Sequence, residues 1–84
     1  MSKREYKFEN REARALPASE LTLALRECFA ESREADPSPA QGDGLREAAD
    51  WIKEGTLTWR QVERALADET WDPADGPRAV LGPG

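Results

Sequence analysis

The side chains that could carry acid–base or nucleophilic chemistry are few in this sequence. Its 84 residues include one cysteine, Cys28, and no histidine. Without histidine, the commonest general base and the Ser-His and Cys-His nucleophile pairs are missing. A lone cysteine also excludes an internal disulfide and a multi-cysteine zinc site. We therefore expect no enzyme activity, no metal and no cofactor, and we interpret Cys28 as a core residue of a helix.

Acidic side chains suggest a binding role instead. Seventeen Asp and Glu face twelve Lys and Arg, which gives a net charge of −5. Residues 1–16 sum to +2 and the other 68 residues to −7. An acidic body disfavours non-specific DNA binding, which needs neutralised phosphates, and it suits a basic protein surface such as a nucleic-acid-binding groove. The alternative is that the charge serves solubility alone.

Three tryptophans, Trp51, Trp59 and Trp71, are many for a chain of this length. Tryptophan buries a large area, carries one N–H donor and is favoured as an anchor in protein interfaces. We expect Trp71 or Trp59 to be an exposed anchor within an acidic face, although all three could instead wrap a small core. The predicted partner-binding residues are Trp59, Trp71, Glu27, Glu31, Glu34, Asp68, Glu69, Asp72 and Asp75.

The clearest local signal is a helix start near residue 58. Thr58 and Gln61 have the spacing of a capping box, in which each side chain satisfies a backbone N–H of the other residue. Leu57 and Val62 flank the box as a hydrophobic staple, and Gly55 suits the left-handed position that ends a helix. A helix–turn–helix unit is therefore predicted at about residues 44–69.

This unit is either a plain helical hairpin or a DNA-binding motif. In the second case the later helix would read DNA, and Thr58, Arg60, Gln61 and Arg64 would face the groove. Glu63, Asp68 and Glu69 on the same helix would face phosphates unfavourably. DNA binding is therefore the alternative, and a basic protein surface the preferred partner.

Hydrophobic spacing predicts three helices, at about 18–34, 44–54 and 58–70. In the first, Leu21, Ala24, Leu25, Cys28 and Phe29 form one apolar stripe, while Leu23 lies off it. Residues 36–44 are expected to be a linker, and Pro and Gly predict a flexible tail at 72–84. Residues 1–16 are expected to form a basic arm, or a short strand or helix. The predicted fold is thus mostly α, a small three-helix assembly over 17–71 with an extended N-terminal arm and a disordered C-terminal tail.

Size, acidity and the lack of catalytic groups favour a non-enzymatic, protein-binding regulator or inhibitor. In these respects the chain is similar to the anti-CRISPR and anti-restriction inhibitors that phages encode. The alternatives are a helix-turn-helix transcriptional regulator and a structural subunit of a larger assembly, and a homodimer is a further option. We expect no membrane association and a cytoplasmic location, because no segment has the length and apolarity of a membrane span or signal peptide.

Overall fold

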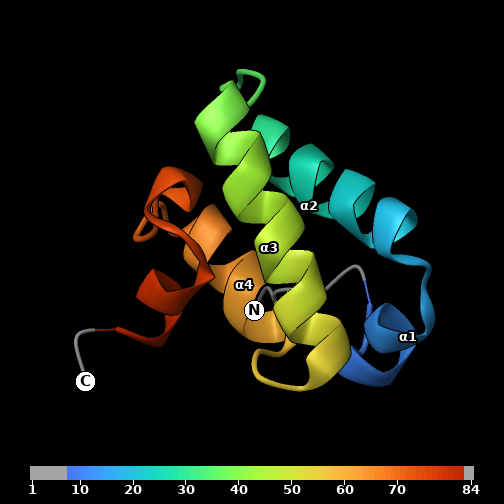
Figure 1. Cartoon of the computed structure of the whole chain (residues 1–84). Coiled ribbons are helices and arrows are strands. Elements are labelled where there is room, and N and C mark those ends of the chain that lie inside the picture. The colour runs from blue at the N-terminus through green and yellow to red at the C-terminus, as the bar shows by residue number, and fades with distance from the viewer. Residues whose placement is uncertain (1–7, 83–84) are drawn as a thin grey trace, which may run out of the picture.

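Residues 8–82, which this computed structural model describes, form four α-helices followed by two short 3-10 helices (Figure 1). Helix α3 lies in the middle and packs against α1, α2, η1 and η2. The predicted mostly helical fold is confirmed. Of residues 1–16, expected to be a basic arm or a short strand or helix, residues 10–15 form a helix and residues 1–7 lie outside the described residues. The elements are α1 (Asn10–Ala15), α2 (Ala18–Arg33), α3 (Pro39–Glu54), α4 (Trp59–Ala67), η1 (Pro73–Asp75) and η2 (Pro77–Leu81).

Helix α2 has nearly the bounds that its apolar stripe predicts. Leu21, Leu25 and Phe29 point into the core and are at most 3% exposed. The helix ends where Glu34 takes the left-handed conformation, with φ of 54°, and donates its N–H to the carbonyl of Ala30. One face of α2 is therefore fixed against the core, and the opposite face is left to solvent.

Helix α3 begins at Pro39, five residues before the predicted start. Ser38 is its N-cap: the Ser38 hydroxyl accepts from the Gln41 N–H at 3.2 Å, and the Gln41 side chain accepts from the Ser38 N–H at 2.9 Å. Pro39 follows at the first helical position, where its fixed φ is favourable. The Ser-Pro-Ala-Gln run is thus a complete start signal, and the linker predicted at 36–44 is wrong from residue 39 onward.

Gly44 lies inside α3 at a position where another chain segment approaches the helix closely. A Cβ at this position would lie 1.7 Å from the carbonyl oxygen of Pro73, a distance that no real contact reaches. Glycine therefore lets η1 pack directly on the α3 backbone. Glycine is unfavourable inside a helix, but the contact with Pro73 requires it at position 44.

The turn between α3 and α4 has the predicted geometry. Gly55 is left-handed, with φ of 90°. The Thr58–Gln61 capping box is complete, since each side chain accepts the other residue's N–H, at 3.1 and 2.9 Å. Leu57 and Val62 on either side are both buried. The helix itself stops at Ala67 rather than at residue 70.

The segment after α4 is folded, which corrects the flexible tail expected from residue 72. Pro73 and Pro77 are buried at the first positions of η1 and η2. The indole Nε1 of Trp71 donates to the carbonyl of Gly76 at 2.8 Å and closes the intervening loop. Proline is poorly suited to the interior of an α-helix, but it is compatible with the start of a short 3-10 turn.

Candidate functional site

Both tryptophans proposed as exposed anchors are core residues. Trp59 is 0% and Trp71 3% exposed. The Trp59 ring meets Phe8 edge-on, with ring centroids 5.1 Å apart. The expectation of an exposed Trp59 or Trp71 is therefore wrong: a domain of this size needs its largest apolar side chains inside, and neither ring offers a contact surface to a partner.

The acidic residues on α2 do form one exposed face. Glu20, Glu27, Glu31 and Glu34, here called the α2 acidic stripe, are all exposed. Glu20, Glu27 and Glu31 are spaced seven and four residues apart, which puts them on one side of α2, away from the buried stripe, and Glu34 follows as the C-cap of the helix. Three of them, Glu27, Glu31 and Glu34, are predicted partner-binding residues.

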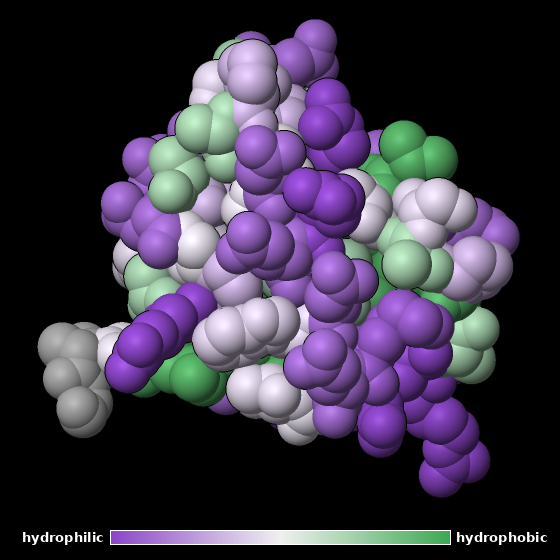
Figure 2. All heavy atoms as spheres, viewed as in Figure 1, coloured by the Kyte–Doolittle hydropathy of each residue, from purple (hydrophilic) through white to green (hydrophobic). Residues whose placement is uncertain are grey.

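A second exposed acidic group follows the end of α4, at Asp68, Glu69, Asp72 and Asp75. Arg33 at the end of α2 joins it to the stripe: its Nη2 donates to the Trp71 carbonyl at 2.8 Å, and its Nε lies 3.9 Å from Glu69. The seven predicted acidic residues thus lie on two segments linked by Arg33. On the face shown in Figure 2, hydrophilic side chains cover much of the surface, with hydrophobic patches at the right side and the lower left.

The carboxylate of Asp72 is used by the fold. It accepts from the Ala74 N–H at 3.0 Å and from Gln41 Nε2 at 3.1 Å. These two hydrogen bonds, helped by the positive charge of Arg33, lower the pKa of Asp72 from its usual value of 3.8. We therefore assign Asp72 to holding η1 on α3.

The residues of the DNA-binding alternative are partly engaged within α4. Thr58 and Gln61 form the capping box. Arg64 lies 3.7 Å from Asp68, one turn along the helix. Arg60 is exposed, but Glu63 lies on the same helix and Asp68 is its C-cap, so the basic groups lie among acids. Thr58 and Gln61 therefore serve the start of α4, while Arg60 and Arg64 have acidic neighbours.

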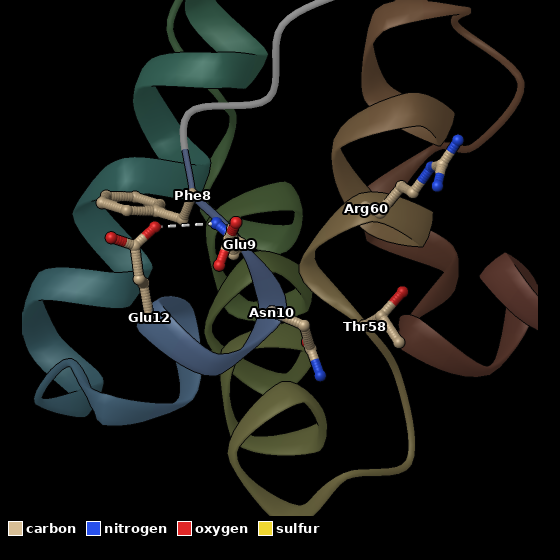
Figure 3. Close-up of a pocket in the computed structure, with 6 residues that line it drawn as sticks. All are labelled: Phe8, Glu9, Asn10, Glu12, Thr58 and Arg60. Atoms are coloured by element: carbon tan, nitrogen blue, oxygen red, sulfur yellow. Dashed lines mark hydrogen bonds between the residues drawn. The ribbon is translucent and has the colours of Figure 1, made fainter.

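An open pocket of about 530 Å³ lies where the starts of α1 and α4 meet (Figure 3). Figure 3 shows Glu9 and Glu12 on the α1 side and Thr58 and Arg60 on the α4 side. Its polar groups act mainly within the fold: Asn10 Oδ1 accepts from the Trp59 N–H at 3.1 Å, and Glu12 accepts from the Glu9 N–H at 3.0 Å. The hydrogen bond between Asn10 and Trp59 therefore links the starts of α1 and α4 beside this pocket.

Sequence reasoning did not identify Asn10 and Leu23 as important surface or contact residues. Asn10 has the side chain of an N-cap, but it serves α4 across 49 residues, and no local pattern predicts such a pairing. Leu23 did carry a signal, because it lies off the apolar stripe of its helix. It is 59% exposed, while Leu21 and Leu25 are fully buried.

A potential membrane span and a potential metal site are both absent from residues 8–82. No helix in this range is both long and apolar enough to cross a membrane. No group of three or more Cys, Asp or Glu side chains in this range is arranged to hold a metal ion. Comparisons of the chain with protein-family models, with curated proteins and with solved structures find no match in any of the three.

Proposed function

We propose that the protein is a non-enzymatic, acidic regulator or inhibitor that binds a basic surface of another protein. The observation that carries this proposal is the α2 acidic stripe, in which three exposed carboxylates line one side of α2 and a fourth, that of Glu34, follows at its C-cap. The nucleic-acid-binding groove of an enzyme is the kind of basic surface that such a stripe complements, as in the inhibitors that phages encode.

Charge gives this interaction its specificity and speed. Residues 8–82 carry sixteen acidic and nine basic side chains, so the folded body is negative. Complementary fields accelerate encounter and disfavour wrong partners, while affinity comes mainly from desolvated contacts. Since Trp59 and Trp71 are buried, those contacts must involve other residues than the anchors predicted from sequence.

The experiment is a nuclease-treated pull-down from bacterial lysate with two matched triple variants. The stripe variant carries Glu27→Gln, Glu31→Gln and Glu34→Gln. The control variant carries Glu47→Gln, Asp50→Asn and Glu54→Gln, which remove the same charge from exposed positions of α3. Capture is quantified by mass spectrometry at two salt concentrations, after circular dichroism has shown that both variants are folded.

We expect a basic protein to be captured by the wild type and by the control variant, and to be lost with the stripe variant or at high salt. Equal capture by all three chains would contradict the proposal. Recovery of nucleic acid, with proteins lost on nuclease treatment, would replace it with the DNA-binding alternative.

A further inference from the structure

An apolar groove lies beside the α2 acidic stripe. It has a volume of about 320 Å³ and is lined by Phe8, Leu16, Glu20, Leu23, Ala24 and Glu27. Phe8 and Leu16 are half-buried and flank α1, whereas Leu23 projects from α2. The groove is therefore built from both sides of the short connection between α1 and α2.

Leu23 is the exposed apolar side chain at this groove, and carboxylates stand on either side of it. Glu20 precedes it by three residues and Glu27 follows by four, so both share its side of the helix. The two acids lie roughly 10 Å apart along the helix axis, at 1.5 Å per residue. An apolar contact flanked by two negative charges has the layout of an interface core with a charged rim.

We propose that this groove binds an amphipathic helix of a partner protein, with an apolar side chain seated against Leu23 and Lys or Arg residues facing Glu20 and Glu27. Partner helices that bind grooves in this way present apolar residues three and four apart. Basic residues spaced two turns apart on the partner match the spacing of the two acids. This inference rests on the proposed function and specifies where the desolvated contact lies.

Charge distinguishes this occupant from a second copy of the chain. A two-fold pairing of α2 faces would set the stripe of one copy against the identical stripe of the other. Eight carboxylates would then share one interface, and like-charge pairs are destabilising. A basic helix removes that repulsion and covers the same apolar area.

The test uses a synthetic leucine–lysine peptide of roughly 14 residues, about four helical turns, with leucines three and four apart. Binding to the full chain is followed by nitrogen-15 NMR titration, which maps the contact. A serine–lysine peptide of equal charge and a leucine–glutamate peptide of equal apolarity are the controls. Leu23→Gln removes the apolar contact, and Leu81→Gln is the matched variant, since Leu81 is the other large exposed apolar residue within residues 8–82, at 49% exposure.

We expect the leucine–lysine peptide alone to bind, with shifts centred on Leu16, Leu23 and Ala24. Leu23→Gln should weaken binding by at least about tenfold, as expected for loss of a central contact, and Leu81→Gln by less than about twofold. Glu20→Gln should weaken binding less and reduce its salt dependence. Unchanged affinity in Leu23→Gln, equal binding of the serine–lysine peptide, or shifts centred elsewhere would overturn the proposal.

Two measurements separate this inference from the proposed function. If the stripe variant loses its captured partner while Leu23→Gln retains it, the groove assignment is wrong and the regulator proposal stands. If sedimentation equilibrium shows a wild-type dimer that Leu23→Gln dissociates, a second copy occupies the groove and the inference is overturned. Peptide binding at the groove, together with loss of capture in Leu23→Gln, supports both.

Discussion

At the scale of single residues, the two glycines inside α3 differ in what surrounds them, so we expect opposite effects on stability when each is replaced by alanine. Gly44 lies against the Pro73 carbonyl, whereas a Cβ at Gly42 would meet only the far end of the Arg26 side chain, at 2.7 Å. We expect Gly44→Ala to lower the free energy of unfolding by about 1–3 kcal/mol, because η1 must move away. Gly42→Ala should raise it by up to about 1 kcal/mol, since alanine favours the helix and Arg26 can turn aside.

Urea denaturation followed by tryptophan fluorescence measures both glycine variants in one experiment. The comparison is well matched, because the two positions are two residues apart in the same helix. Equal effects of the two substitutions on stability would show that the close contact with Pro73 is not the reason for glycine at position 44. Gly44→Ala with wild-type stability would contradict the packing of η1 on α3.

Asp72 predicts a pH dependence of stability. Its pKa is lowered in the folded chain, chiefly by the hydrogen bond from the Ala74 N–H and then by that from Gln41. The ionised carboxylate therefore stabilises the fold above the unfolded pKa, near 3.8, and this contribution is lost as the pH falls through the lower folded value. The wild type should exceed Asp72→Asn in stability at pH 7, and the two should converge below that pKa.

Urea midpoints measured between neutral and strongly acidic pH check this dependence. Asp75→Asn is the charge-matched control, because it removes one negative charge from η1, which Asp72 caps, and leaves both Asp72 hydrogen bonds in place. A gap between wild type and Asp72→Asn that stays constant with pH would show that the charge of Asp72 is not coupled to folding.

At the scale of elements, the sequence predicted those helix boundaries that depend on hydrogen bonds between residues close in the chain. The turn from Gly55 to Gln61 follows its sequence closely, since both hydrogen bonds of its capping box join residues three apart. The start of α3 also had a local signal at Ser38, but Gly42 and Gly44 outweighed it. The contact with Pro73 explains why position 44 is glycine. Pro73 is far from Gly44 in the sequence, so a local sequence pattern does not predict this contact.

The same limit applies to the candidate site. The exposed acids of α2 follow from helical spacing alone, because a face opposite the apolar stripe must meet solvent. The burial of Trp59 depends on Phe8 and Asn10, which lie about fifty residues earlier in the chain. The groove beside Leu23 likewise needs the position of α1, which its six residues do not specify by themselves.

Helix α1 is short, and its position depends on a lysine from α3. Lys53 Nζ donates to the carbonyls of Arg14, at 3.0 Å, and Leu16, where α1 ends. Lys53→Met keeps the apolar stem and removes both hydrogen bonds, so we expect a loss of about 2 kcal/mol. Amide exchange at Ala13 and Leu16 should accelerate more than exchange in the middle of α2.

Arg46→Met is the control for Lys53, since it removes a positive charge from an exposed position of the same helix. Arg46 lies 3.8 Å from Asp43, an exposed pair expected to contribute less than about 1 kcal/mol. If Lys53→Met leaves exchange in α1 unchanged, the helix is held by packing alone. A displaced α1 would also weaken peptide binding at the groove, because Leu16 forms one of its walls.

At the scale of the whole molecule, the C-terminal segment belongs to the core. Small domains bury a limited fraction of their surface, so each additional buried segment matters for stability. Trp71, Pro73 and Pro77 extend the apolar interior beyond α4, and η1 and η2 both pack on α3. Composition alone predicted a flexible tail here because Pro and Gly exclude an α-helix, but they do not exclude a folded segment.

Deletion of residues 73–84 distinguishes these two descriptions of the C-terminal segment. A flexible tail could be removed without effect, whereas the folded segment predicts a loss on the order of 3 kcal/mol, from exposed apolar surface and a lost indole hydrogen bond. Trp71 would lose its Gly76 acceptor and part of its cover, so its fluorescence should shift to the red. Thermal denaturation and emission spectra of the two chains measure both effects. Unchanged stability with unchanged emission would mean that α1–α4 form the complete folding unit, and that η1 and η2 only rest on it.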